Sequence, residues 1–199
     1  PEYHIKNTNS RFANCELRIY CLNLFQITSM KIHNGMRPQD IVVLLKIATK
    51  GNNKWLMKDL SAELNISASE ISESLNRSVL AGLLADDKKK LMKTALLEFL
   101  QYGLAYVYPQ HPGAIVRGMP TAYSAAPLSK SIISENPVVW SYAEGKYRGQ
   151  AIEPLHPSVP VACMKDNKLY ELLALTDALR IGKARERNSA IKELKERIC

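Results

Sequence analysis

Hydrogen-bonding side chains gather at helical spacing in one stretch of this 199-residue sequence, residues 67–77. Most of them are short, so a helix that carried them could lie close to a partner surface. Asn and Arg pair bidentately with the edges of adenine and guanine, and Glu accepts a hydrogen bond from cytosine. This chemistry is that of base contacts in a DNA groove, and the alternative is an ordinary solvated helix face. The residues predicted to contact DNA are Ser67, Ser69, Ser72, Glu73, Asn76 and Arg77 in this stretch, with Lys88, Lys89 and Lys90 downstream.

A second set of residues is a candidate pocket for a small ligand. Arginine offers a fork of donors to an anion, and the face of a tryptophan or tyrosine ring attracts a cation or a planar group. The alternative is that these side chains only pack and pair in a small irregular core. They are Arg117, Tyr123, Trp140 and Arg148.

The remaining reactive residue types form no recognisable site. The four cysteines, Cys15, Cys21, Cys163 and Cys199, are far apart, and no histidine pair has metal-ligand spacing. Lone thiols of this kind fit a reducing cytoplasm. No phosphate-binding glycine loop, serine elbow or zinc-protease motif is present. We therefore expect a cytoplasmic protein with no metal, no cofactor and no enzymatic activity.

The first set of residues requires a helix, which the sequence predicts over residues 68–81. Ser67 can cap its first turn, and Glu70 can reach back to the amide of that cap. Gly82 can end it in the left-handed conformation. One side of this helix should be buried, because it carries Ile71, Leu75 and Val79.

Neighbouring elements complete a familiar arrangement. One helix is predicted to begin at Pro38 and end near Gly51, and a shorter one spans 57–64. The turn at 65–67 then leads into the helix described above, as in a helix-turn-helix. Residues 83–92 are predicted to form a small hairpin with lysines at its tip.

Three segments, Asp59–Ser67, Ser72–Arg77 and Ala81–Leu84, resemble the core of bacterial winged-helix transcriptional regulators. They are most similar to the MarR-like group, in the pattern A-x-x-L-x-[IV]-[ST] and in the Gly-Leu-Leu exit into the wing. The resemblance covers roughly a quarter to a third of the chain. It implies a DNA-binding winged helix but not MarR-type drug sensing. The sequence departs from the group in its short wing, which lacks the Asp-x-Arg signature, and in having no long dimerisation helices around the domain.

Composition is consistent with an anionic partner. The formal net charge is +8 and the pI is near 9.3, and double-stranded DNA is the partner expected. With 46% hydrophobic and 23% charged residues, the chain can bury a real core. No apolar run approaches the ~20 residues of a membrane span, so no membrane partner is expected.

Residues 93–107 are predicted to form a helix with a broad apolar face. Leucines at helical spacing form its centre, and Phe99, Tyr102 and Tyr106 widen it. Such a face must be covered, either by the C-terminal half of the chain or by a second copy. A homodimer is therefore expected, and it would present two recognition helices to a two-fold DNA site.

Prolines change the character of the chain over residues 108–162. They exclude long helices, so extended segments and turns are predicted there. A short strand is expected over 114–117, and residues 138–140 and 147–152 are expected to pair as a hairpin.

From Asn167 onward the pattern is helical again, and a break at Gly182 predicts two helices or one kinked helix. Basic residues around this break would either grip phosphate or form exposed ion pairs. They are Arg180, Lys183, Arg185 and Arg187.

The predicted fold class is α+β, mainly α. A winged helix-turn-helix domain is followed by a Pro-rich irregular or β segment and a C-terminal helical hairpin. The expected divisions are 30–107 for the winged helix-turn-helix with its trailing helix, and 108–199 for the rest. Residues 1–29 are expected to be an N-terminal extension, native or added upstream of a start at Met30 or Met36, with no function assigned.

Three functions are compatible with these observations. The first is a sequence-specific DNA-binding transcriptional regulator that acts as a dimer. The alternative is a protein-interaction adaptor or antitoxin-like subunit, in which the winged helix is a docking scaffold for a protein partner. The third is a sensor that binds a small ligand through the Pro-rich segment.

Overall fold

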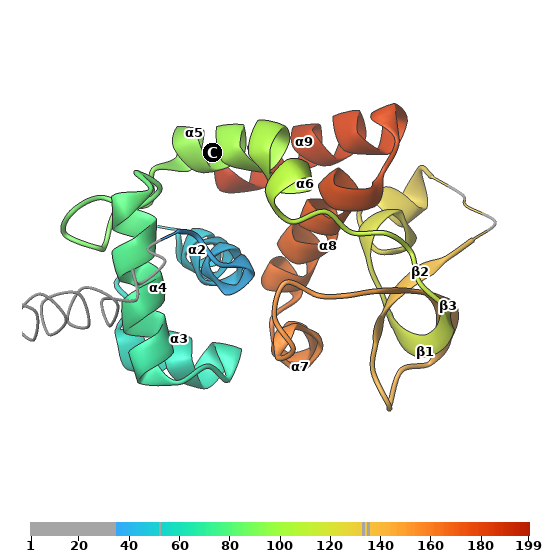
Figure 1. Ribbon diagram of the computed structural model, residues 1–199, viewed down its shortest axis with the longest axis horizontal. Coiled ribbons are helices and arrows are strands. Elements are labelled where there is room, and N and C mark those ends of the chain that lie inside the picture. The colour runs from blue at the N-terminus through green and yellow to red at the C-terminus, as the bar shows by residue number, and fades with distance from the viewer. Residues whose placement is uncertain (1–34, 52, 133, 135) are drawn as a thin grey trace, which may run out of the picture. The chain divides into compact units, whose positions relative to one another are not determined.

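Helices make up most of the chain that the computed structural model describes, residues 35–51, 53–132, 134 and 136–199 (Figure 1). A small three-stranded sheet accompanies them. The prediction of a mixed, mainly helical fold is confirmed at this level. The predicted N-terminal extension lies outside the described residues.

Helix α2 (Pro38–Lys50) supplies much of the core against which α3 (Met57–Leu64) and α4 (Ala68–Leu80) pack. Its residues Ile41–Leu45 are fully buried. The helix begins as the sequence predicts, with proline at its first position, and the Asp40 carboxylate accepts a hydrogen bond from the Arg37 amide at 2.7 Å. It ends at Gly51, whose φ of 58° suits glycine.

Helices α3 (Met57–Leu64) and α4 (Ala68–Leu80) follow, joined by a tight turn. Asn65 makes the turn in the left-handed region, with φ of 54°. Ser67 caps α4 as predicted, since its hydroxyl accepts from the Glu70 amide at 3.3 Å. The Glu70 carboxylate accepts from the Ser67 hydroxyl at 3.2 Å, so it contacts the side chain of the cap and not the cap amide.

A short hairpin leaves α4 through Gly82, which has φ of 70° and donates its amide to the Val79 carbonyl at 2.9 Å. Leu84 and Leu91 then pair antiparallel. The Ala85 amide donates to the Lys90 carbonyl at 2.9 Å. The lysine-tipped hairpin that the sequence predicts is therefore formed.

The predicted helix over 93–107 is present, but its hydrogen bonding changes along its length. It comprises α5 (Lys93–Glu98), a π-helical turn (Phe99–Gly103) and α6 (Leu104–Val107). Its leucines face α8 and α9 of the C-terminal part and are buried. The C-terminal part therefore covers the centre of the broad apolar face.

The sheet consists of β1 (Ile115–Pro120), β2 (Val138–Ser141) and β3 (Tyr147–Ile152). Two 3-10 turns, Ala122–Ser124 and Leu128–Lys130, connect β1 to β2. Each of the other strands pairs antiparallel with β1, and β2 and β3 pair parallel, so the three strands close into a ring.

The predicted hairpin between β2 and β3 is therefore wrong. Both strands find their antiparallel partner in β1, where Gly118 is opposite Ser141 on one side and Tyr147 on the other. Gly118 allows this close approach, because a Cβ there would lie 1.9 Å from the Trp140 carbonyl oxygen.

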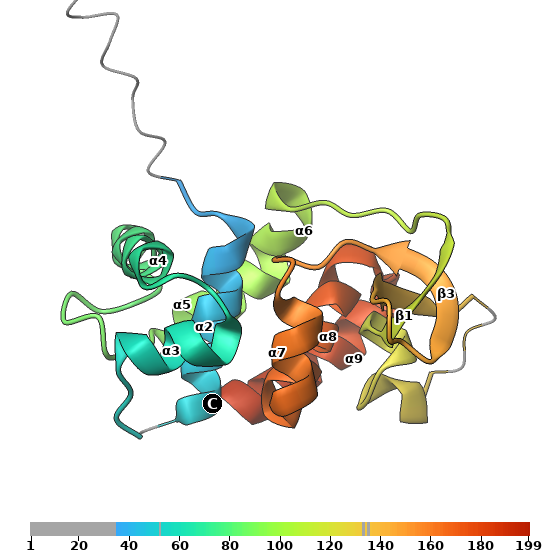
Figure 2. The ribbon, with the colours of Figure 1, turned by 90° about the horizontal axis from the view of Figure 1, so that it is seen from below.

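The C-terminal part contains α7 (Val159–Lys165), α8 (Asn167–Ile181) and α9 (Ala184–Ile198). The sequence did not predict α7, although its proline is near the start of the helix, where proline is tolerated. The chain breaks at Gly182 into two helices, and α8 and α9 pack together as the predicted helical hairpin (Figures 1 and 2).

Helix α8 is mostly buried from Leu169 onward, and polar contacts hold the sheet to it. Asp177 accepts hydrogen bonds from Trp140 Nε1 at 2.6 Å, from Thr121 Oγ1 at 2.9 Å and from Arg180 Nη1 at 2.7 Å. Arg180 also donates to the carbonyls of Tyr108 and Glu153. Because its guanidinium is buried in this network, Arg180 is not available to grip phosphate.

Candidate nucleic-acid interface

The outward side of α4 presents short polar groups and one carboxylate. Ser69, Glu73 and Asn76 are exposed, as is the cap residue Ser67, while Ser72 is half-buried. The opposite side of α4 packs against α2 and α3. The helix is therefore fixed by its apolar side, and the polar side is free to meet a flat or grooved partner.

Arg77 does not belong to this outward surface, and its predicted exposure is wrong. Its side chain is buried at 7% exposure and turns towards α2. Its Nε and Nη2 atoms donate to the two Asp40 carboxylate oxygens at 2.8 and 2.7 Å. A buried carboxylate requires a partner, and Arg77 supplies the bidentate one.

The tip of the hairpin lies beside α4. Lys88 Nζ donates to Asn76 Oδ1 at 2.6 Å, which joins the predicted base-contacting and phosphate-contacting groups. Asp87 shapes the tip, because its carboxylate accepts from the amides of Lys89 and Lys90. These two backbone hydrogen bonds lower the pKa of Asp87. Lys88, Lys89 and Lys90 are all exposed.

Further lysines extend the basic surface beyond the predicted set. A hollow of about 560 Å³ lies between the hairpin and the segment that leads into α3. Lys54 and Lys93 line it together with Lys89 and Lys90, and Trp55 forms part of its wall. Sequence analysis missed this grouping because Lys54 is far from the other lysines along the chain. The hairpin folds back so that its lysines lie near Lys54.

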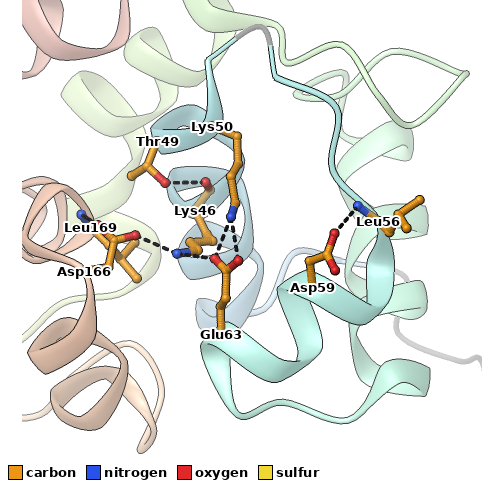
Figure 3. Close-up of polar contacts among 8 residues, drawn as sticks. All are labelled: Lys46, Thr49, Lys50, Leu56, Asp59, Glu63, Asp166 and Leu169. Atoms are coloured by element: carbon orange, nitrogen blue, oxygen red, sulfur yellow. Dashed lines mark hydrogen bonds and ion pairs between the residues drawn. The ribbon is translucent and has the colours of Figure 1, made fainter.

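A partly buried ion cluster positions α3 against the rest of the protein (Figure 3). Lys46 of α2 lies between Glu63 of α3 and Asp166 ahead of α8, with its Nζ 2.5 Å from Glu63 Oε2 and 2.6 Å from Asp166 Oδ2. Lys50 also contacts Glu63, at 2.6 Å. Asp166 additionally caps α8, since it accepts from the Leu169 amide at 3.1 Å.

The protonation states of this cluster follow from its contacts. Burial acts to lower the pKa of Lys46, but the hydrogen bonds to the two carboxylates outweigh it and the pKa is raised. For Glu63 and Asp166, burial acts to raise the pKa, but the hydrogen bonds from Lys46 outweigh it and both values are lowered. The charged forms of all three groups are therefore favoured in the folded protein.

The structure does not bring the candidate ligand set together. Trp140 is buried at 1% exposure, and its indole nitrogen is committed to Asp177. Arg117 and Arg148 face each other directly across β1 and β3 and are exposed. Tyr123 lies outside the sheet, with its hydroxyl 3.5 Å from the Asn136 carbonyl. The predicted pocket of these four residues is therefore not formed.

The described residues contain neither a group of metal ligands nor a helix that could span a membrane. Among residues 35–199 with their gaps, no three His, Cys, Asp or Glu side chains form a group that could hold a metal ion. No helix in the same part of the chain combines the length and apolarity needed to cross a membrane.

Comparison of the chain with protein-family models, with characterised proteins and with solved structures finds no match.

Proposed function

We propose that the protein binds double-stranded DNA as a sequence-specific transcriptional regulator, with α4 as its recognition helix in a winged helix-turn-helix. The single observation that carries this proposal is the surface formed by α4 and the hairpin. Exposed Ser69, Glu73 and Asn76 lie on the helix, and the lysine-bearing tip is joined to it through Lys88. Such a surface combines groups for base edges with groups for phosphate.

The contact between Lys88 and Asn76 is compatible with this role. Both side chains are exposed, and a hydrogen bond of this kind contributes only about 1 kcal/mol. DNA binding would break this hydrogen bond, because Lys88 would move to a phosphate. The amide oxygen and nitrogen of Asn76 would then both be available to a base. The lysines of the neighbouring hollow would hold the flanking backbone.

The test is fluorescence anisotropy with the protein's own upstream DNA and with a scrambled duplex, each over a salt series. We expect binding to the native duplex to survive salt concentrations that release the scrambled one. Replacing Lys88, Lys89 and Lys90 by alanine should flatten the salt dependence by a slope of roughly 0.9 for each phosphate that these lysines neutralise. Equal, salt-sensitive binding to both duplexes would contradict sequence-specific regulation.

We further propose that the protein is a homodimer. The support is an apolar patch on the π-helical turn and α6, where Tyr102 is 67%, Tyr106 83% and Val107 52% exposed. Sedimentation analysis should give a dimer mass, and Tyr106→Glu should give a monomer with weakened DNA binding. A folded protein that is monomeric, binds no DNA and co-purifies with another protein would instead support the adaptor function for this patch.

A further inference from the structure

A cavity of about 470 Å³ lies between the sheet and the helices α7 and α8. It is distinct from the pocket that the sequence suggested, since it contains neither arginine of that set. Its volume falls within the range of small-molecule sites, roughly 300–1,000 Å³. The apolar and aromatic side chains on its walls include Met119, Val139, Tyr142, Tyr147, Met164 and Tyr170.

Two of the large side chains that line the cavity are exposed to solvent. Tyr147 is 61% exposed and Met164 is 58% exposed, although both line the cavity. Aromatic faces and thioethers interact favourably with flat, polarisable rings. A planar molecule in the cavity would cover both side chains.

Two polar groups of opposite character line the same cavity, in the loop between β2 and β3. The carboxylate of Glu144 accepts from the Tyr142 hydroxyl at 3.3 Å and retains further acceptor capacity. Lys146 has three donors and no partner among the described residues. The loop therefore offers an acceptor and a donor two residues apart.

We propose that this cavity binds a planar nitrogen heterocycle of purine size. Tyr147 and Met164 cover its faces, Glu144 accepts from its N–H groups, and Lys146 donates to a ring nitrogen or carbonyl. A guanine ring fits this description, since it carries an N–H donor edge and the O6 and N7 acceptors.

The position of the cavity links it to the proposed DNA surface, and this step rests on the proposed function. Met164 and Tyr170 line the cavity on either side of Asp166 in sequence. Asp166 caps α8 and binds Lys46, which also binds Glu63 of α3 (Figure 3). A ligand that shifts Met164 or Tyr170 therefore acts on the cluster that holds α3, the helix preceding α4.

Binding is tested by calorimetric titration of the full chain with guanosine. We expect saturable binding that Tyr147→Ala weakens by roughly tenfold and that Lys146→Ala also weakens. Lys165→Ala is the matched control, because that lysine is exposed on α7 and does not line the cavity. Absence of binding, or equal binding by the Tyr147 variant, overturns the site. Equally tight binding of 2-naphthol overturns the assignment to a nitrogen heterocycle.

Coupling is tested by repeating the DNA titration with and without guanosine. The expected result is a change in DNA affinity that Asp166→Asn abolishes while its guanosine binding persists. If guanosine binds but DNA affinity does not respond, the ligand site stands and the coupling is wrong. If guanosine binds and no DNA binds at all, the proposed DNA function fails and the ligand site remains.

Discussion

Asn76 and Arg77 are adjacent in the chain, and the rotation of about 100° between successive helical residues gives them different surroundings. Asn76 lies on the exposed side of α4, within reach of the hairpin. Arg77 lies on the side that faces α2 and closes the bidentate contact to Asp40. One residue is therefore available to a partner, and its neighbour holds the helix that presents it.

Replacing Asn76 by alanine tests the first of these roles. If Asn76 contacts a base, Asn76→Ala should reduce affinity for the native upstream duplex by about 1–3 kcal/mol and relax specificity at one base pair. Binding to scrambled DNA should not change, since phosphate contacts remain. Lys192→Ala on α9 is the control for an exposed residue away from α4. Unchanged affinity of the Asn76 variant, measured by anisotropy, would remove Asn76 from the interface.

Replacing Arg77 by methionine tests the second role. The variant leaves the buried Asp40 carboxylate without its guanidinium, so we expect a loss of about 3–5 kcal/mol in the free energy of unfolding. Urea denaturation measures this loss, with the exposed Arg187→Met as a control that should be near neutral. A variant as stable as the wild type that no longer bound DNA would instead place Arg77 at the DNA surface.

The backbones of the small sheet approach one another closely at three glycines. Gly118, Gly145 and Gly149 each lie where a Cβ would meet another strand or loop at 2.5 Å or less. Side chains at these positions would force the backbones apart. The ring of three strands therefore requires glycine at these positions.

Gly118→Ala should disrupt this ring. The added methyl group would lie 1.9 Å from the Trp140 carbonyl oxygen, so we expect destabilisation of about 3 kcal/mol or more. Gly113→Ala is the matched control, since its nearest neighbour would be the Ala151 carbonyl oxygen at 3.5 Å, an ordinary contact. Thermal unfolding followed by circular dichroism compares the two. Equal midpoints would show that the ring tolerates a side chain at Gly118.

The positions of the helices and strands could be predicted from the sequence more fully than the pairing of the strands, and the reason is the range of the signals involved. Pro38, Ser67 and Gly82 act within one turn of the chain, and the elements that they bound begin or end where expected. The pairing of β2 with β3 depends on β1, which ends at Pro120, well before β2 begins at Val138. No local pattern distinguishes a direct hairpin from two strands that share a third.

The candidate site shows the same limit. The exposure of Asn76 and of the hairpin lysines follows from helical spacing and local polarity. The burial of Arg77 and Trp140 follows from partners 37 residues away in each case, Asp40 and Asp177. The grouping of Lys54 with the hairpin lysines around the hollow likewise arises only when the chain folds. In each case the residue type indicated which hydrogen bonds or charges the side chain could offer. The packing of the fold decided which partner receives them.

At the scale of the whole molecule, Lys46 connects parts of the chain that are distant in sequence, since Asp166 lies 120 residues away. Its two carboxylate partners come from α3 and from the residue ahead of α8. The stability of this connection depends on pH. Glu63 and Asp166 have lowered pKa values in the folded state, so their contribution is complete above the ordinary values of 4.5 and 3.8. It is lost as the pH falls through the lowered folded-state values.

Asp166→Asn measures this contribution. Asparagine retains the helix cap but removes the charge, so at pH 7 we expect a loss of about 2 kcal/mol in the free energy of unfolding. The difference from wild type should shrink as the pH falls below 3.8 and through the lowered folded-state pKa of Asp166, because the wild-type carboxylate then also becomes protonated. The exposed Asp86→Asn serves as the control. A difference that is the same at every pH would show that the charge of Asp166 does not stabilise the fold.

The closed ring of β1, β2 and β3 has one more consequence. Each of these strands pairs with both of the others over part of its length, so the described sheet closes on itself. Open edges recruit strands from other chains and so promote amyloid-like aggregation. The closed arrangement of β1, β2 and β3 therefore leaves fewer unpaired strand positions for such addition than an open sheet would. Assembly through this sheet would therefore have to use its side chains more than the addition of a strand.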